Sequence, residues 1–151
     1  MTPLPVTPIR VIVLAALICG ILDITCTLAL SRLKGITPKR LLQTITSALL
    51  GSKSFQGGVS TAIIGLMIHF FIAFIAAAIY FAAAHQLCVS LGRAALFGLF
   101  YGTAVHLFMT FVALPLSALQ RPFSAKAFVT QWIIHMAFVG LPIALIVQHF
   151  S

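Results

Sequence analysis

Long uninterrupted runs of apolar residues dominate the pattern of this chain. A helix needs about 20 residues to cross a hydrocarbon layer of about 30 Å, because each residue advances it by about 1.5 Å. Four runs reach that length, at about 11–30, 59–84, 94–116 and 127–150. Backbone polar groups find no water in lipid, so a spanning segment closes its hydrogen bonds within itself. The pattern predicts an all-α, polytopic membrane protein, a single domain built as a four-transmembrane-helix bundle.

A shorter periodic segment lies in the first connection. Thr37 and Pro38 form a helix-start signal and Gly51 a stop signal, which together predict a short amphipathic helix over about 38–50. Apolar residues repeat along one face, while Lys39, Arg40 and uncharged polar residues fill the other. Two interpretations fit this helix: it lies on the cytoplasmic leaflet with Lys39 and Arg40 at anionic lipid headgroups, or it packs against the rest of the protein.

Composition and charge agree with a membrane setting. Of the 151 residues, 62% are hydrophobic and only 7% are charged, whereas soluble domains carry about a quarter charged residues. The formal net charge of +8 arises from residues that flank the spans, where anionic lipid suffices as a partner. A nucleic-acid partner is therefore disfavoured.

The basic residues divide unevenly between the two sides of the predicted bundle. Of the nine Lys and Arg residues, only Arg10 and Arg93 belong to the second connection and the termini. The first and third connections hold Arg32, Lys34, Lys39, Arg40, Lys53, Arg121 and Lys126. The positive-inside rule then places these two connections in the cytoplasm and both termini outside.

Each predicted span contains one ionisable residue near its middle. These residues are Asp23, His69, His106 and His135. Counted from the basic side, each lies about nine to eleven residues into its span, which corresponds to a depth of about 13–17 Å. Ionisable side chains are costly inside a membrane unless they face inward and find partners there. We therefore expect the four to form a cluster near the bilayer midplane.

Polar and sulfur-containing side chains accompany this cluster at helical spacing. The expected lining consists of Cys26, Thr27, Thr103, Met109, Thr110 and Gln131. Pro142 lacks a backbone N–H, so it should free the carbonyl of Phe138 and kink the fourth span beyond His135.

Several short motifs resemble those of small four-span bacterial inner-membrane proteins that have no assigned function. The motifs are Asp23 after Gly-Ile-Leu, His69 before a small-residue run, Tyr101-Gly102 leading to Leu114-Pro115-Leu116, and His135 before Gly140-Leu141-Pro142. The resemblance covers nearly the whole chain. It implies a bacterial inner-membrane location and carries no activity.

Three interpretations of the Asp/His cluster remain open. In the first, His69, His106, His135 and Asp23 bind a zinc, iron or copper ion, or two of the histidines hold haem b as axial ligands. In the second, the cluster lies on a proton or small-solute pathway. In the third, it holds no cofactor and its hydrogen bonds fix helix packing in a structural or accessory subunit.

Little in the sequence points to an enzyme. No HExxH motif occurs, and no serine lies at the depth of the cluster, so we assign no catalytic residue. The expected outer faces are uniformly apolar and the connections are short. These features favour a homo-oligomer or a subunit of a larger membrane complex.

Overall fold

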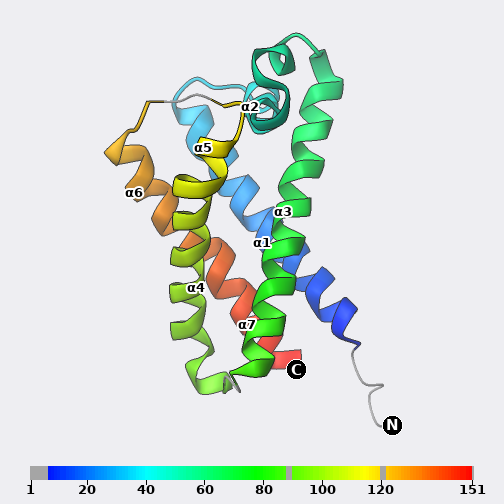
Figure 1. Ribbon diagram of the computed structural model, residues 1–151, viewed down its shortest axis with the longest axis vertical. Coiled ribbons are helices and arrows are strands. Elements are labelled where there is room, and N and C mark those ends of the chain that lie inside the picture. Colours follow the sequence, from blue (N-terminus) through cyan, green and yellow to red (C-terminus); the bar gives the residue numbers. More distant parts are fainter. Residues whose placement is uncertain (1–6, 88–89, 120–121, 151) are drawn as a thin grey trace.

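The computed structural model describes residues 7–87, 90–119 and 122–150. Across these ranges the regular secondary structure is entirely helical. Four helices there are long and apolar enough to cross a membrane: Pro8–Leu33, Gly58–Gln86, Leu91–Leu116 and Ala125–Phe150. The prediction of an all-α, four-span bundle is confirmed (Figure 1).

Two of the spans are regular helices and two are composite. Along the chain the elements are α1 (Pro8–Leu33), α2 (Pro38–Leu50), the 3-10 helix η1 (Gly51–Phe55), α3 (Gly58–Gln86), the 3-10 helix η2 (Leu91–Arg93), α4 (Ala94–Phe108), the π-helix η3 (Met109–Ala113), α5 (Leu114–Leu116), α6 (Ala125–Ile134), the π-helix η4 (His135–Gly140) and α7 (Leu141–Phe150).

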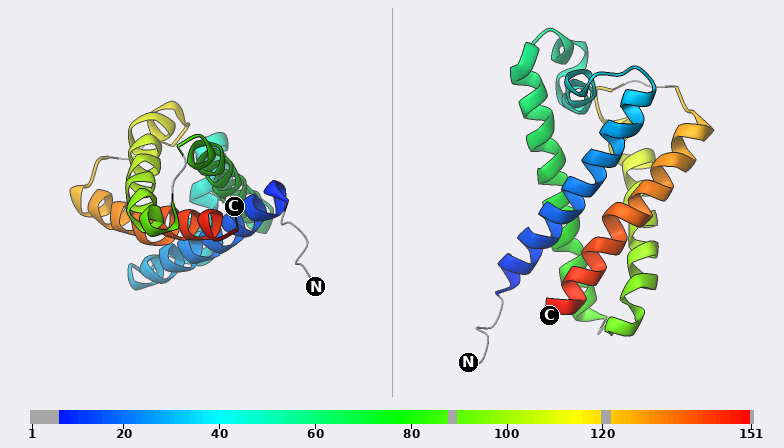
Figure 2. Two further views of the ribbon diagram at one scale, coloured as in Figure 1. Left: turned by 90° about the horizontal axis from the view of Figure 1, so that it is seen from below. Right: turned by 180° about the vertical axis from the view of Figure 1, so that it is seen from behind.

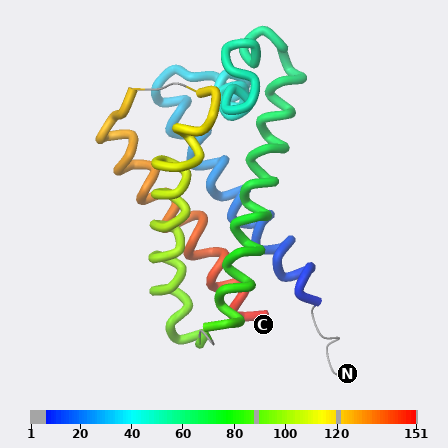
Figure 3. The backbone as a smooth tube through the Cα atoms, viewed as in Figure 1, coloured from blue at the N-terminus to red at the C-terminus, as the bar shows by residue number. Residues whose placement is uncertain are grey.

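The spans form two layers. Helices α3 and α4 stand in one layer, and α1 lies beside the α6–α7 span in the other, inclined to the first pair (Figures 1 and 2). The path of the backbone places α2 and the α5–α6 connection at one end of the bundle, and the start of α1 and the end of α7 at the other (Figure 3). The first and third connections therefore share one end, here called the basic end.

The basic end carries Arg32, Lys34, Lys39, Arg40, Lys53 and Lys126 on described elements, whereas Arg121 lies outside the described residues. The depths of the ionisable residues are counted from the basic side, which requires the first and third connections to lie at the same end of the bundle. They do lie at the same end. The assignment of the basic end to the cytoplasm stays a prediction.

Small residues hold the opposite half of the bundle together. Around α1, α3 and α7 a buried core contains Val11, Ala15, Ala16, Cys19, Ala73, Ala76, Ala77, Tyr80, Ala84, Val139, Ile143, Ala144 and Val147. Lipid tails are as apolar as these side chains, so the contact between spans depends on close van der Waals packing rather than on exclusion of water. Alanine and glycine permit that approach.

A close approach joins α4 to η4. Gly98 and Gly102 lie one turn apart on α4 and face Gly140. A Cβ atom on Gly140 would overlap the carbonyl oxygen of Gly98 and the backbone of Gly102, so only glycine fits there.

Helix α2 begins and ends where the sequence predicts. The Thr37 hydroxyl accepts a hydrogen bond from the backbone N–H of Arg40 at 3.2 Å, and Gly51 ends the helix with a φ of 58°. The packing of α2 differs from the expected amphipathic arrangement, because Gln43, Thr46 and Ser47 are its buried residues. Leu49 and Leu50 are exposed instead. The most buried residues of α2 are therefore polar rather than apolar.

Hydrogen bonds explain this inversion. The Gln43 amide donates to the Gly58 carbonyl at 2.8 Å, and the Thr46 hydroxyl donates to the Thr61 carbonyl at 2.5 Å. The Thr61 hydroxyl in turn donates to the Ser54 carbonyl at 2.6 Å. These bonds attach α2 and η1 to the first turns of α3, so α2 is a packed helix whose charged residues Lys39 and Arg40 remain exposed.

Both composite spans contain a π-helix just before a Leu-Pro pair. Pro115 follows η3 and Pro142 follows η4, each by two residues. A proline lacks the N–H that would pair with the carbonyl four residues earlier, here Phe111 and Phe138. Each of these carbonyls lies inside the π-helix, so the distortion expected from Pro142 takes the form of η4, which begins at His135.

A substitution at Gly140 tests the close approach of α4 and η4. We expect Gly140→Ala to lower the free energy of unfolding by about 1–3 kcal/mol, because the added methyl group would overlap backbone atoms of α4. Gly92→Ala is the matched control, since a Cβ there enters open space. Thermal unfolding in detergent measures both, and equal unfolding temperatures for the two variants would contradict this packing.

A second substitution tests the attachment of α2. Thr46→Val removes a buried hydroxyl that donates to α3, which costs about 1–3 kcal/mol. Thr44→Val, on the same helix, loses only an exposed local bond to the Arg40 carbonyl. We expect hydrogen–deuterium exchange of the α2 amides to rise about tenfold or more in Thr46→Val and little in Thr44→Val. Equal exchange in both variants would show that the buried bond does not hold α2.

Candidate functional site

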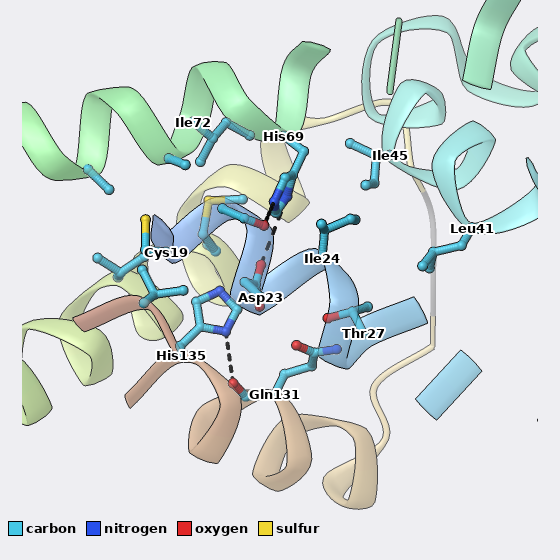
Figure 4. A pocket seen from close by; sticks show the side chains of 16 residues that line it. Cys19, Asp23, Ile24, Thr27, Leu41, Ile45, His69, Ile72, Gln131 and His135 are labelled. Carbon is cyan, nitrogen blue, oxygen red and sulfur yellow. Dashed lines mark hydrogen bonds and ion pairs between the residues drawn. The ribbon is translucent and has the colours of Figure 1, made fainter. Parts of the chain in front are cut away.

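A cavity of about 200 Å³ lies between the two layers of spans. Three of the four expected residues line it: Asp23 from α1, His69 from α3 and His135 from η4 (Figure 4). Thr27, Met109 and Gln131, also expected from the sequence, are among the other lining residues. Its remaining walls are apolar: Ile24, Leu41, Ile45, Ile72, Ala73, Ala76, Val105 and Val139.

Asp23 and His69 face each other across the contact between α1 and α3. Nδ1 of His69 lies 3.9 Å from Oδ2 of Asp23, and Nε2 of His69 lies 2.9 Å from the carbonyl oxygen of Gly20. A carbonyl oxygen only accepts, so Nε2 carries the hydrogen of this bond. In the neutral ring, Nδ1 then presents a lone pair toward the carboxylate.

His135 has the opposite arrangement. Its Nδ1 lies 2.8 Å from the carbonyl oxygen of Gln131, one turn earlier in the same span, and therefore donates to it. This bond orients the ring and leaves Nε2 as the lone-pair nitrogen of the neutral form. A histidine whose second nitrogen is tied to a backbone carbonyl has the arrangement common among metal ligands.

One carboxylate oxygen in this cavity lacks a hydrogen-bond donor among the described residues. Oδ1 of Asp23 is buried and has no hydrogen-bond partner within the part of the chain that the structure describes. Asp23 is the only acidic residue of the protein. Burying an acceptor without a partner is costly, and burying a charge costs more. A cation, a proton or a water molecule would give this oxygen a partner.

His106 does not line the cavity. It is 3% exposed, and its ring lies beside those of His135 and Phe128, with centroid separations of 5.2 and 4.7 Å. The ionisable residues thus form two contacts, Asp23 with His69 and His106 with His135. Among the described residues, no three His, Cys, Asp or Glu side chains lie close enough together to hold a metal ion directly. The expected convergence of four ligands is not found in this conformation.

The other expected lining residues have different surroundings. Thr103 accepts a hydrogen bond from Nε1 of Trp132 at 3.0 Å and joins α4 to α6. Thr110 lines a second cavity, and Cys26 is half-buried outside both. On α2, the guanidinium of Arg40 lies 3.7 Å above the ring of Phe55.

Two features of the site do not follow from the pattern of the sequence. One is the Gly20 carbonyl as the partner of His69, because any carbonyl on the facing turn of α1 could accept this bond. The other is the contribution of Leu41 and Ile45, which close part of the cavity from α2. Their spacing marks an apolar stripe on α2 and does not reveal what the stripe covers.

Scans against models of protein families, curated proteins and solved structures found no match to this chain. The function is therefore argued from the site alone.

The two histidines of the cavity should occupy opposite tautomers. At mildly alkaline pH, we expect hydrogen on Nε2 of His69 and on Nδ1 of His135, because each of these nitrogens donates to a carbonyl. Nitrogen-15 NMR of histidine-labelled protein separates the two forms, with His69→Gln and His135→Gln spectra for assignment. The same tautomer at both positions would contradict the described geometry.

Proposed function

We propose that this integral membrane protein binds one small transition-metal cation in the cavity between Asp23, His69 and His135. The observation that carries the proposal is that Asp23, His69 and His135 line one cavity, where Oδ1 of Asp23 is buried and has no partner among the described residues. Imidazole nitrogen and carboxylate oxygen together suit zinc, iron or copper.

The Asp23–His69 pair fits the first two ligand positions. Two atoms bound to one ion at about 2.0–2.2 Å each lie about 3–4 Å apart, and Oδ2 and Nδ1 are separated by 3.9 Å. His135 stands on another wall and would act through water, since about 200 Å³ is room for several water molecules. Water as a further ligand is consistent with the lack of three converging protein ligands.

Haem b, the other cofactor considered from the sequence, does not suit this cavity. Sites for drug-sized ligands enclose about 300–1,000 Å³, and this cavity is smaller. His106 is one of the three histidines considered as axial haem ligands. Its ring faces His135 and Phe128 rather than an open space.

Proton transfer is the second candidate, and one observation favours it. The Asp23–His69 contact and His135 face a space that can hold water, and a proton relay works through water without direct contact between its groups. A purely structural centre would need water in the cavity to give Oδ1 of Asp23 the hydrogen bond that it lacks among the described residues.

The surroundings of the site suggest further partners. We place anionic lipid headgroups at the exposed residues Lys39 and Arg40, in a bacterial inner membrane with the basic end in the cytoplasm. The apolar outer faces would meet lipid, a second copy or another subunit.

Elemental analysis by mass spectrometry tests the proposal. Tag-free protein purified in detergent should hold zinc, iron or copper at about one atom per chain, and the double variant His69→Ala/His135→Ala should hold none. The matched control is His85→Ala/His149→Ala, which removes two exposed histidines outside the cavity. A metal-free native protein, or equal loss in both double variants, would overturn metal binding at this site.

A further inference from the structure

A second, larger cavity of about 480 Å³ lies between η3, α5 and the first turns of α6. Its walls come from the basic end of the bundle and include Thr110, Leu114, Ser124, Ala127 and Phe128. Figure 1 shows α5 and α6 near the basic end of the bundle, where these lining residues lie.

Gln131 is the residue common to the two cavities. It lies on α6 one turn before His135 and is half-buried. Its side chain extends toward Thr27 at the edge of the central cavity, while its backbone carbonyl accepts the bond from His135 (Figure 4). A primary amide offers an oxygen acceptor and two hydrogen donors, so it can contact a hydrated cation or water on either side.

In the opposite half of the bundle, the described residues of the spans form a packed core. Below the central cavity, Val11, Ala15, Ala77, Ile143 and Val147 are each at most 1% exposed. They belong to one packed core that continues upward to Cys19, Ala73 and Ala76 in the cavity wall. A guest in the central cavity therefore has tightly packed apolar side chains on that side.

We infer that the central cavity exchanges its guest with the solution at the basic end, through the second cavity, and that the Gln131 side chain is the gate between the two. The nature of the guest rests on the proposed function. The route rests only on the two cavities and on Gln131, the lining residue that they share. Loading from one side of the membrane follows from this arrangement.

Thiol accessibility tests the route without any metal. In a background with Cys19→Ala, Cys26→Ser and Cys88→Ser, Ile72→Cys places a thiol in the wall of the central cavity. A membrane-impermeant, positively charged methanethiosulfonate reagent is added to one face of sealed vesicles at a time. In a parallel protein, Lys53→Cys, exposed at the basic end, identifies the face being treated.

We expect Ile72→Cys to react only from the basic face. Adding Gln131→Trp should slow the reaction at least tenfold, and Ala127→Trp, which fills the second cavity without altering Gln131, should do the same. Lys126→Trp is the matched control, because it neighbours Ala127 but does not line the cavity, and it should leave the rate unchanged. Unfolding temperatures show which variants keep the fold.

Reaction from the opposite face, reaction from neither face, or unchanged rates in folded Gln131→Trp and Ala127→Trp would each overturn the inference. The proposed function fails separately, through a metal-free native protein, so the two failures are distinguishable.

Discussion

Hydrocarbon supplies no hydrogen-bond partners, and this constraint organises the whole molecule. It makes each span a helix, and it gives His69 and His135 backbone carbonyls as partners. Where prolines remove donors, the spans respond with π-helices rather than with backbone open to lipid. Among the described residues, three buried side-chain atoms have no partner: Asp23 Oδ1, Tyr80 Oη and His106 Nε2. Of these residues, only Asp23 lines the central cavity, where the protein has also left room for a guest.

At the basic end, the same constraint explains why the amphipathic helix α2 buries polar side chains. Polar side chains of α2 point inward because the carbonyls of Gly58 and Thr61 offer acceptors there. Leu49 and Leu50, near the end of α2, are exposed instead. This orientation also lets Leu41 and Ile45 cover the central cavity, so the attachment of α2 and the enclosure of the site have one cause.

The sequence predicts the features that depend on distance along the helix axis. Span positions, the Thr37 cap, the Gly51 stop and the common level of Asp23 and the histidines all follow from local signals and from a fixed rise per residue. Rotation about the axis is not fixed in this way. His106 turns toward His135 and Phe128 rather than toward the cavity, and Thr103 turns toward Trp132, because neighbouring helices decide which face is buried. Polar residues at one depth therefore did not make one four-residue site.

The π-helices η3 and η4 also bear on how this chain tolerates changes of length. A π-helix holds about one residue more per turn than the α-helix around it. Deleting one residue from the His135–Gly140 segment would leave α6 and α7 with their present faces toward their neighbours, although it would bring Pro142 against the carbonyl four residues earlier. The same deletion in the middle of α3 would rotate all later residues by about 100° and carry Ala77 and Ala84 off the core. Loss of single residues is therefore absorbed within the two composite spans, whereas α3 has a fixed length.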